Sequence, residues 1–283
     1  MKRLIHIEWL KNYSYFPVIL FSSIYFLLVI GFTLLCSVKS IPILGIPVNI
    51  RDQSFLNFPQ IWNFLTYITA LLKIFLGLII IFTISNEFTS KMFKQNVIDG
   101  LSKKEFILSK ILTIGMLSLI STLVVFFMGL ILGFSFSESS DVSLIFKEFY
   151  FILGYFLKLF TFLSFLFFIT VLLKRVVFVF LSFFLWWIIE IILLVVEYSS
   201  KVIEKFDSQG NRITEVPFLL SDYLPLNVMS NLIDEPFQRI RIVSQLTGGS
   251  FEYSIPYGAV VASLIYSALF LFGSYWLIKR KDW

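Results

Sequence analysis

Residues 149–173 read FYFILGYFLKLFTFLSFLFFITVLL and residues 176–196 read VVFVFLSFFLWWIIEIILLVV, with only Lys174 and Arg175 between the two stretches. Both stretches reach the length of about 20 mostly apolar residues that a helix needs to cross the hydrocarbon core of a bilayer. Four other stretches have a similar length and composition, at residues 17–36, 61–85, 107–134 and 256–278. The sequence therefore predicts an all-α integral membrane protein with six transmembrane helices.

The composition indicates lipid rather than water as the main solvent. Hydrophobic residues make up 58% of the 283 residues and charged residues 14%, against about half and about a quarter in soluble domains. Six spans and their loops would use nearly the whole chain, so no separate catalytic domain is expected. The single Cys36 excludes an intrachain disulfide, and the single His6 leaves no His and Cys cluster for zinc. We expect no metal or other cofactor in this chain.

The loops on the two sides of the predicted spans differ in charge. One side holds thirteen Lys and Arg and five Asp and Glu, a net charge of +8, whereas the other holds eight basic and twelve acidic residues, a net charge of −4. Because basic loops stay in the cytoplasm, we place the positive side and both termini on the cytoplasmic side of a bacterial inner membrane. The net charge of +5 is thus explained by the distribution of charges between the two sides of the membrane. Nucleic acid is not an expected partner. The negative outer side weakly favours a cationic or amphipathic cargo.

Residues 1–16 predict a helix on the membrane surface. Ile5, Trp9 and Tyr13 are spaced four residues apart, and the charged residues of this segment mostly lie between them. This spacing is typical of an amphipathic interfacial helix with membrane lipid as its partner. A frayed cytoplasmic tail is the alternative.

Residues 197–255 form the longest polar segment, which we place outside. Within it, residues 216–233 are apolar but are interrupted by Pro217 and Pro225 and carry Asp222. A segment this broken does not make a further span in lipid. We therefore predict short, broken outer helices before the last span.

Three charged residues fall inside the predicted spans: Lys73, Lys158 and Glu190. Lys158 lies 16 residues before Lys174, and Glu190 lies 15 residues after Arg175. At a rise of about 1.5 Å per residue both would lie at the same height, roughly 23 Å from the turn. The two are therefore predicted to meet as a pair. The alternative is that each reaches water at the outer surface.

The loop between the second and third predicted spans, residues 86–110, reads NEFTSKMFKQNVIDGLSKKEFILSK. It resembles the corresponding loop of ABC-2-type permeases, the membrane-spanning subunits of one class of ABC transporter. In that family a Glu follows the second span, and a basic residue, a Gly or Pro turn, a Ser-Arg or Ser-Lys pair, an aromatic residue and a Lys come next. The matching residues are Glu87, Lys94, Gly100, Ser102, Lys103, Phe106 and Lys110. The sequence departs from the family at Lys91-Met92, where many members have Gly-Thr.

The resemblance extends across the chain and implies a single ABC-2-type transmembrane domain, residues 1–283. Its parts would be an interfacial helix (1–16), spans 1–5 (17–196), an outer segment (197–255), and span 6 with a cytoplasmic tail (256–283). It implies the permease subunit of an ATP-driven exporter that works by alternating access. The partners would be an ABC ATPase subunit, which binds ATP and Mg²⁺, and a second copy of the chain or a homologous permease. The sequence holds no G-x-x-x-x-G-K-[ST] motif, so the chain itself is not expected to be an enzyme.

By the same resemblance, the loop would be the coupling segment that contacts the ATPase. A helix from Glu87 to Ile98 would begin with an acid at the positive end of its dipole and would end near Gly100, which tolerates left-handed geometry. Its apolar residues could enter a groove on a soluble partner. Alternatively, its lysines only fix the topology. The predicted coupling residues are Glu87, Phe88, Lys91, Phe93, Lys94, Gly100, Ser102 and Lys103.

Two other functions compete with that of a permease. An intramembrane protease needs paired acids with a His, or a Ser and Lys dyad, at membrane depth. The three charged residues in the spans do not supply this set, because the only histidine, His6, lies outside them. A membrane scaffold or passive pore without an ATPase partner is the alternative function.

Overall fold

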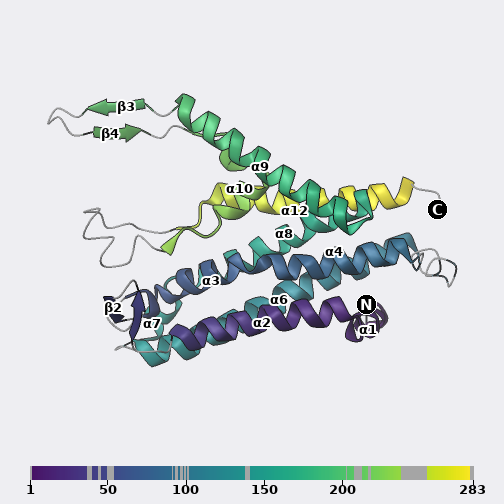
Figure 1. The fold of residues 1–283 in the computed structure, drawn as a ribbon, viewed down its shortest axis with the longest axis horizontal. Coiled ribbons are helices and arrows are strands. Elements are labelled where there is room, and N and C mark those ends of the chain that lie inside the picture. Colours follow the sequence, from purple (N-terminus) through teal and green to yellow (C-terminus); the bar gives the residue numbers. More distant parts are fainter. Residues whose placement is uncertain are drawn as a thin grey trace.

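The computed structural model of the chain describes residues 2–36, 40–43, 46–49, 54–90, 92, 95, 98, 100, 102–137, 141–201, 203–206, 212–215, 218–236 and 254–280. Within these residues the fold is a bundle of helices (Figure 1). The long helices are α2 (Phe16–Cys36), α3 (Ile61–Leu71), α4 (Lys73–Thr89), α6 (Lys103–Phe136), α8 (Tyr150–Leu173), α9 (Val176–Lys201) and α12 (Tyr257–Arg280). The shorter ones are α1 (Lys2–Tyr13), α7 (Val142–Phe146), α10 (Pro225–Ser230) and the 3₁₀ turns η2 (Ser54–Leu56) and η3 (Ser221–Tyr223).

Two short β-hairpins, which the sequence did not predict, lie outside the helical bundle. Strands β1 (Ser40–Ile43) and β2 (Ile46–Asn49) pair antiparallel, as do β3 (Ile203–Phe206) and β4 (Arg212–Glu215). Both hairpins lie at the end of the bundle on the left of Figure 1, which we call the hairpin end. Helix α1 and the last turn of α12 lie at the opposite end, which we call the termini end.

The apolar helices are of membrane-spanning length, as predicted. Five helices among the described residues are long and apolar enough to cross a membrane, and there are six if the bent pair α3 and α4 counts as one. The predicted 61–85 span is thus not one straight helix, because α3 and α4 meet at a 41° bend. Several long apolar helices in one chain indicate a protein that spans a membrane.

The bend lies at Leu72, between α3 and α4. The Leu72 N–H donates to the Thr69 carbonyl at 3.0 Å, which is the tight i to i−3 pattern rather than the α-helical one. In the turns before it, the hydroxyls of Thr66 and Thr69 donate to the carbonyls of Trp62 and Leu65 four residues back. Such bonds compete for the carbonyls of the helix ladder and bend helices.

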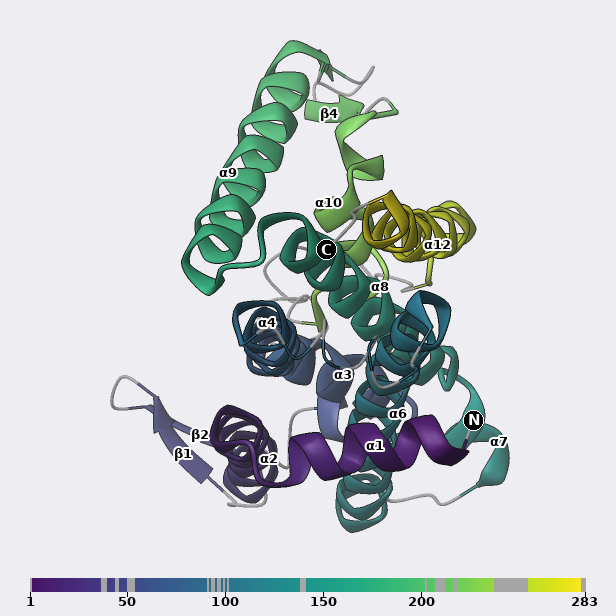
Figure 2. The same cartoon turned by 90° about the vertical axis from the view of Figure 1, so that its right-hand side faces the viewer.

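Helix α8 forms the centre of the core. It packs against α3, α4, α6, α9 and α12, and aromatic side chains such as Phe151, Phe162 and Phe165 are buried on it. Helix α9 is the opposite case, since only Val179 and Glu190 are buried along its length. Figure 2, which looks at the termini end, shows α8 in the middle of the bundle and α9 at its edge.

Candidate functional site

A cluster of charged side chains is buried at the termini end. The Lys110 ammonium on α6 lies 2.8 Å from both carboxylate oxygens of Glu8 on α1 and 2.5 Å from Oε1 of Glu87 on α4. Lys11 of α1 lies 3.4 Å from the same Glu87 oxygen. The side chains of Lys110, Glu8 and Glu87 are at most 4% exposed. We call these four residues the charged cluster; its two ammonium groups and two carboxylates sum to zero charge.

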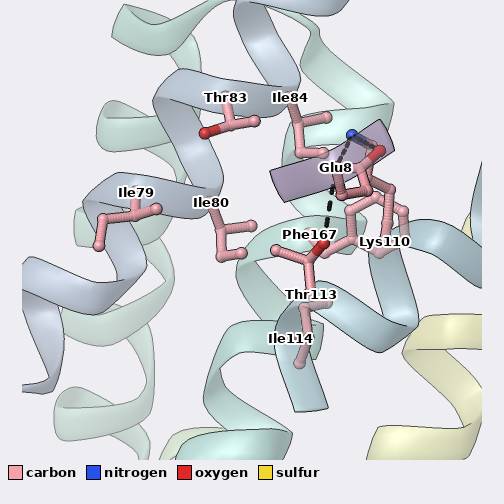
Figure 3. Close-up of a pocket in the computed structure, with 9 residues that line it drawn as sticks. All are labelled: Glu8, Ile79, Ile80, Thr83, Ile84, Lys110, Thr113, Ile114 and Phe167. Carbon is pink, nitrogen blue, oxygen red and sulfur yellow. Dashed lines mark hydrogen bonds and ion pairs between the residues drawn. The ribbon is translucent and has the colours of Figure 1, made fainter. Parts of the chain in front are cut away.

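Helix α1 reaches the cluster because it lies across the termini end of the bundle, where α2 and α4 are seen nearly end-on in Figure 2. Two hydroxyl groups of α6 donate hydrogen bonds to the Glu8 carboxylate of α1. Ser109 Oγ donates to Glu8 Oε1 at 3.0 Å, and Thr113 Oγ1 donates to Oε2 at 3.4 Å. Figure 3 shows Glu8 between Lys110 and Thr113, which lie one turn apart on α6. One face of α6 therefore surrounds the carboxylate with donors.

The start of α6 places these donors. Ser102 is the N-cap: its hydroxyl accepts from the Glu105 N–H at 3.2 Å, and its own N–H donates to the Glu105 carboxylate at 2.9 Å. This reciprocal capping box sets the first turn of the helix. Lys103 donates to the Lys279 carbonyl of α12 at 3.3 Å. Two of the predicted coupling residues thus fix the beginning of α6.

Burial and neighbouring charges act in opposite directions on the pKa of Glu8. Burial alone would raise the pKa of the Glu8 carboxyl, but the Lys110 charge, its hydrogen bond and the Lys11 charge outweigh burial and lower that pKa below its usual value. The carboxylate is therefore the stable form. Buried ion pairs of this kind add little net stability over an apolar core, but removing one partner is costly.

Acid should weaken the cluster through Glu8. Because its pKa is lower in the folded than in the unfolded chain, its stabilising contribution is complete above the ordinary glutamate pKa of about 4.3 and is lost as the pH falls through the lower folded value. We expect the unfolding temperature in detergent to fall between roughly pH 5 and pH 3 more steeply for the wild type than for Glu8→Gln. Equal slopes in a thermal-unfolding series would contradict this linkage.

A very small cavity adjoins the cluster. Its volume is about 10 Å³, and Glu8, Thr83, Lys110 and Phe167 are among its lining residues (Figure 3). That is about the smallest space that holds one water. The Thr83 hydroxyl and Glu87 Oε2 are buried and have no hydrogen-bond partner within the described part of the chain. The cavity beside the cluster is therefore of the size of one water molecule.

The structure describes five of the eight predicted coupling residues: Glu87, Phe88, Gly100, Ser102 and Lys103. Glu87 belongs to the charged cluster, and the partly buried Phe88 packs against the core with the Lys174 ammonium 5.9 Å from its ring centroid. Gly100 has φ of +92°, the left-handed geometry that was predicted. Lys91, Phe93 and Lys94 lie outside the described residues.

The predicted helical position of Glu87 was wrong. It does not begin a separate coupling helix; it lies in the last turn of α4, which continues to Thr89. The apolar run of α4 contains no residue that ends the helix before that point. The carboxylate therefore lies at the negative end of a helix dipole, and Lys110 compensates it. Beyond α4, residues 92, 95 and 98 are helical.

The predicted contact between Lys158 and Glu190 is also not formed. Glu190 accepts hydrogen bonds from the backbone N–H groups of Leu226 and Asn227 at 3.0 Å and from the Trp186 ring N–H. Lys158 donates to the Ser230 carbonyl at 3.3 Å. The two charges thus bind opposite ends of α10. The Glu190 carboxylate accepts from N–H groups at its first turn, and the Lys158 ammonium donates to a carbonyl at its end, as the helix dipole favours. Lys73 lies with its ammonium 4.7 Å from the centroid of the Phe162 ring.

Sequence reasoning missed three polar groups. Glu8 was not singled out, although it is the only acid in a basic N-terminal segment. Glu197, seven residues after Glu190, accepts from the N–H groups of Leu220 and Ser221 at 2.9 and 2.7 Å; its heptad spacing from Glu190 was a usable signal. The third group joins the buried hydroxyls of Tyr25, Ser121 and Tyr155 within 2.9 Å of one another.

Within the described ranges, no group of three His, Cys, Asp or Glu side chains could hold a metal ion.

Comparisons of the chain with models of protein families, with curated proteins and with solved structures find no match.

Proposed function

We propose that the chain is the permease subunit of an ATP-driven ABC exporter of the ABC-2 type in a bacterial inner membrane. It would have six spans, with α3 and α4 together forming the second, α1 on the inner membrane surface, and both termini in the cytoplasm. The observation that carries the proposal is the charged cluster. It joins α1, α4 and α6 where the loop between α4 and α6 begins and ends.

The charged cluster connects that loop to three helices, α1, α4 and α6. Glu87 lies in the last turn of α4 and Lys110 in the second turn of α6, so both ends of the loop are fastened to each other. Glu8 adds α1 to the same ion pairs. A displacement of the loop would therefore move α4 and α6 as one body and would pull on a helix that lies at the membrane surface. An ATPase that pushes on the loop needs such a rigid connection.

The loop also offers apolar contacts. Met92 is 38% exposed and Ile98 is 83% exposed, and both belong to the helical turn positions that follow α4. Exposed apolar side chains on a short helical segment are typical anchors for a groove on a partner. The alternative, a scaffold or passive pore without an ATPase, gives these residues no role.

Purification of the chain from its native membrane tests the function directly. We expect a second polypeptide with a phosphate-loop motif to co-purify in stoichiometric amount and to hydrolyse ATP, because this chain has no such motif. The same preparation shows whether the permease is paired with itself or with a homologue. A chain that purifies without any ATPase, at a yield showing an intact protein, would favour the scaffold or pore.

Charge placed on the loop should weaken binding of the ATPase. Ile98→Asp puts a carboxylate where an apolar anchor is proposed, and we expect binding about tenfold weaker or worse, with unchanged membrane insertion. Lys104→Asp is the control, since Lys104 is exposed at the same end of the bundle but outside residues 91–100. Equal ATPase binding by both variants in a pull-down titration would mean that the loop does not dock.

Reporter fusions test the orientation. We expect cytoplasmic signals after Lys11, Gly100, Arg175 and Asp282 and external signals after Gln53, Ser140 and Gly210, because the basic loops stay inside. An external signal after Gly100 would place the loop where no ATPase can reach it.

A further inference from the structure

Unpaired amide side chains are concentrated where α3 begins. In the described part of the chain, ten buried side-chain nitrogen and oxygen atoms have no hydrogen-bond partner, and four of them lie within residues 57–63. These four atoms are Asn57 Oδ1, Gln60 Oε1, and both Oδ1 and Nδ2 of Asn63. Buried polar groups are hydrogen-bonded in most cases, and an exception is explained by a bound water or by a functional role.

The three amides follow one another along the start of a helix. The Ile61 N–H donates to the Asn57 carbonyl at 3.1 Å, and the Phe64 N–H donates to the Gln60 carbonyl at 3.2 Å. Gln60 is the N-cap of α3, with φ of −65° and ψ of −23°, and its side chain makes no capping bond. Residues three apart on a helix are neighbours on its surface. Gln60 and Asn63 therefore belong to one face of the helix, and Asn57 lies one turn before Ile61.

The aromatic contacts of α3 do not account for the burial of Asn63. Trp62 stacks on Phe126 of α6 with the ring centroids 5.8 Å apart, and the Phe64 ring lies 4.4 Å from that of Phe55 in η2. Successive residues are about 100° apart around a helix, so Asn63 points toward neither of these contacts. Its side chain is nevertheless 0% exposed. The carboxamide is thus enclosed on another side of α3.

The other buried polar side chains of α3 have partners. The hydroxyls of Thr66 and Thr69 donate to carbonyls of their own helix, and the Trp62 ring N–H donates to the Ile145 carbonyl at 2.6 Å. The Asn63 carboxamide offers two N–H donors and an oxygen acceptor. An apolar side chain in this position would leave no such group unpaired. The position of Asn63 therefore favours a polar occupant next to it.

Figure 1 shows α3 in the half of the bent span that is nearer the hairpin end. Polar residues in membrane spans usually face the interior of the bundle or a water-filled space. We infer that the carboxamides of Gln60 and Asn63 form a hydrogen-bonding site for neutral hydroxyl groups, which water reaches from the hairpin end. Water itself fits the site, because a buried water bonds to about three otherwise unpaired polar groups. If the proposed function holds, the site lies on the outer part of the substrate route and the substrate carries hydroxyl groups.

Thiol modification of the full chain in a neutral detergent tests the access of water. The single native cysteine is first removed by Cys36→Ser. The reagent is 2-hydroxyethyl methanethiosulfonate, which is neutral and soluble in water and forms a mixed disulfide with a cysteine thiolate. We expect Asn63→Cys to react about ten times faster than Leu65→Cys, since reaction requires a hydrated thiolate. Leu65 is the matched control because it is 1% exposed and lies on the opposite side of the same helix. Equal rates would overturn the inference.

Recognition of the hydroxyl is tested at Gln60→Cys, with Asn63 intact. The hydroxyethyl reagent is compared with ethyl methanethiosulfonate, which lacks only the hydroxyl group. The ratio of the two rates is divided by the same ratio at Asp141→Cys, an exposed position at the hairpin end. We expect a corrected ratio of about five or more, which Asn63→Leu in the same chain lowers to about one. A ratio of about one with Asn63 present would mean that no hydroxyl group is recognised there.

Thermal unfolding separates the site from a structural role. Asn63→Leu should unfold at the same or a higher temperature than the wild type, because it removes an unpaired buried amide. Asn63→Val is measured as well, in case the larger leucine does not fit. Lower unfolding temperatures of both variants would make Asn63 a structural residue and would overturn the inference.

None of these measurements needs an ATPase or transport. If the chain purifies without an ATPase but shows the expected rates, the site stands and the proposed function does not. If an ATPase is bound but the rates at Asn63→Cys and Leu65→Cys are equal, the site alone is overturned.

Discussion

Replacing Lys110 by methionine should lower the free energy of unfolding by about 3 to 5 kcal/mol, because it leaves the carboxylates of Glu8 and Glu87 buried without their shared cation. In thermal unfolding this corresponds to a fall of roughly 10 °C or more. The loss should be smaller in mild acid than at pH 8, because a stranded buried carboxylate is less costly when it is protonated. Transport-coupled ATP hydrolysis should fall as well if the proposed function is correct.

The matched control is Lys104→Met, which removes a lysine from the exposed face of the same first turns of α6. It should change stability by less than about 0.5 kcal/mol. The double variant Glu8→Gln with Lys110→Met should be less destabilised than the sum of the two single variants, because each removes the partner of the other. Additive losses in that cycle would mean that the cluster is not a coupled unit.

Replacing Glu190 by leucine should release α10. The carboxylate accepts from the N–H groups of Leu226 and Asn227 and from the Trp186 ring, and each buried donor left unpaired costs about 1 to 3 kcal/mol. We expect hydrogen exchange across residues 218–236 to rise at least about a hundredfold, with a smaller effect on α4 and α6.

Asp141→Leu serves as the control for this variant, since Asp141 is an exposed acid at the hairpin end that makes no side-chain capping bond. It should leave exchange in residues 218–236 unchanged. Exchange in Glu190→Leu that equals the wild type would show that the packing of α10 against α8 and α12, rather than the carboxylate, holds it in place.

The helices were predictable from the sequence because long apolar runs end at charged residues. Helix α8 ends at Leu173 and α9 begins at Val176, on either side of Lys174 and Arg175, as expected. The bend at Leu72 was not predicted, because hydropathy is equally high on both sides of it. Its signal was local: Thr66 and Thr69 have hydroxyls that bond to carbonyls four residues back, and a hydropathy average does not register them.

The site was predictable only in part. Glu87 and Lys110 both stood out in the loop pattern, but nothing in the sequence pairs them with Glu8, which is 102 positions from Lys110. That contact depends on α1 crossing the end of the bundle. Lys158 and Glu190 do have polar partners, as expected, but the partners are backbone groups of α10. The sequence does not show that α10 lies next to both side chains. Backbone groups of α10 were nearer to each charge than the charges were to each other.

The exposure of nearly all side chains of α9 bears on the order in which the helices of the protein assemble. A helix with only Val179 and Glu190 buried can enter the bilayer by itself, because its remaining side chains are as well solvated by lipid as by protein. At that stage the Glu190 carboxylate lacks the backbone N–H donors of α10. Residues 218–236 supply these N–H groups only after they have left the ribosome, and Leu226 lies 36 positions after Glu190. In this order of assembly α9 enters the bilayer first, and α10 later completes the hydrogen bonds of its carboxylate.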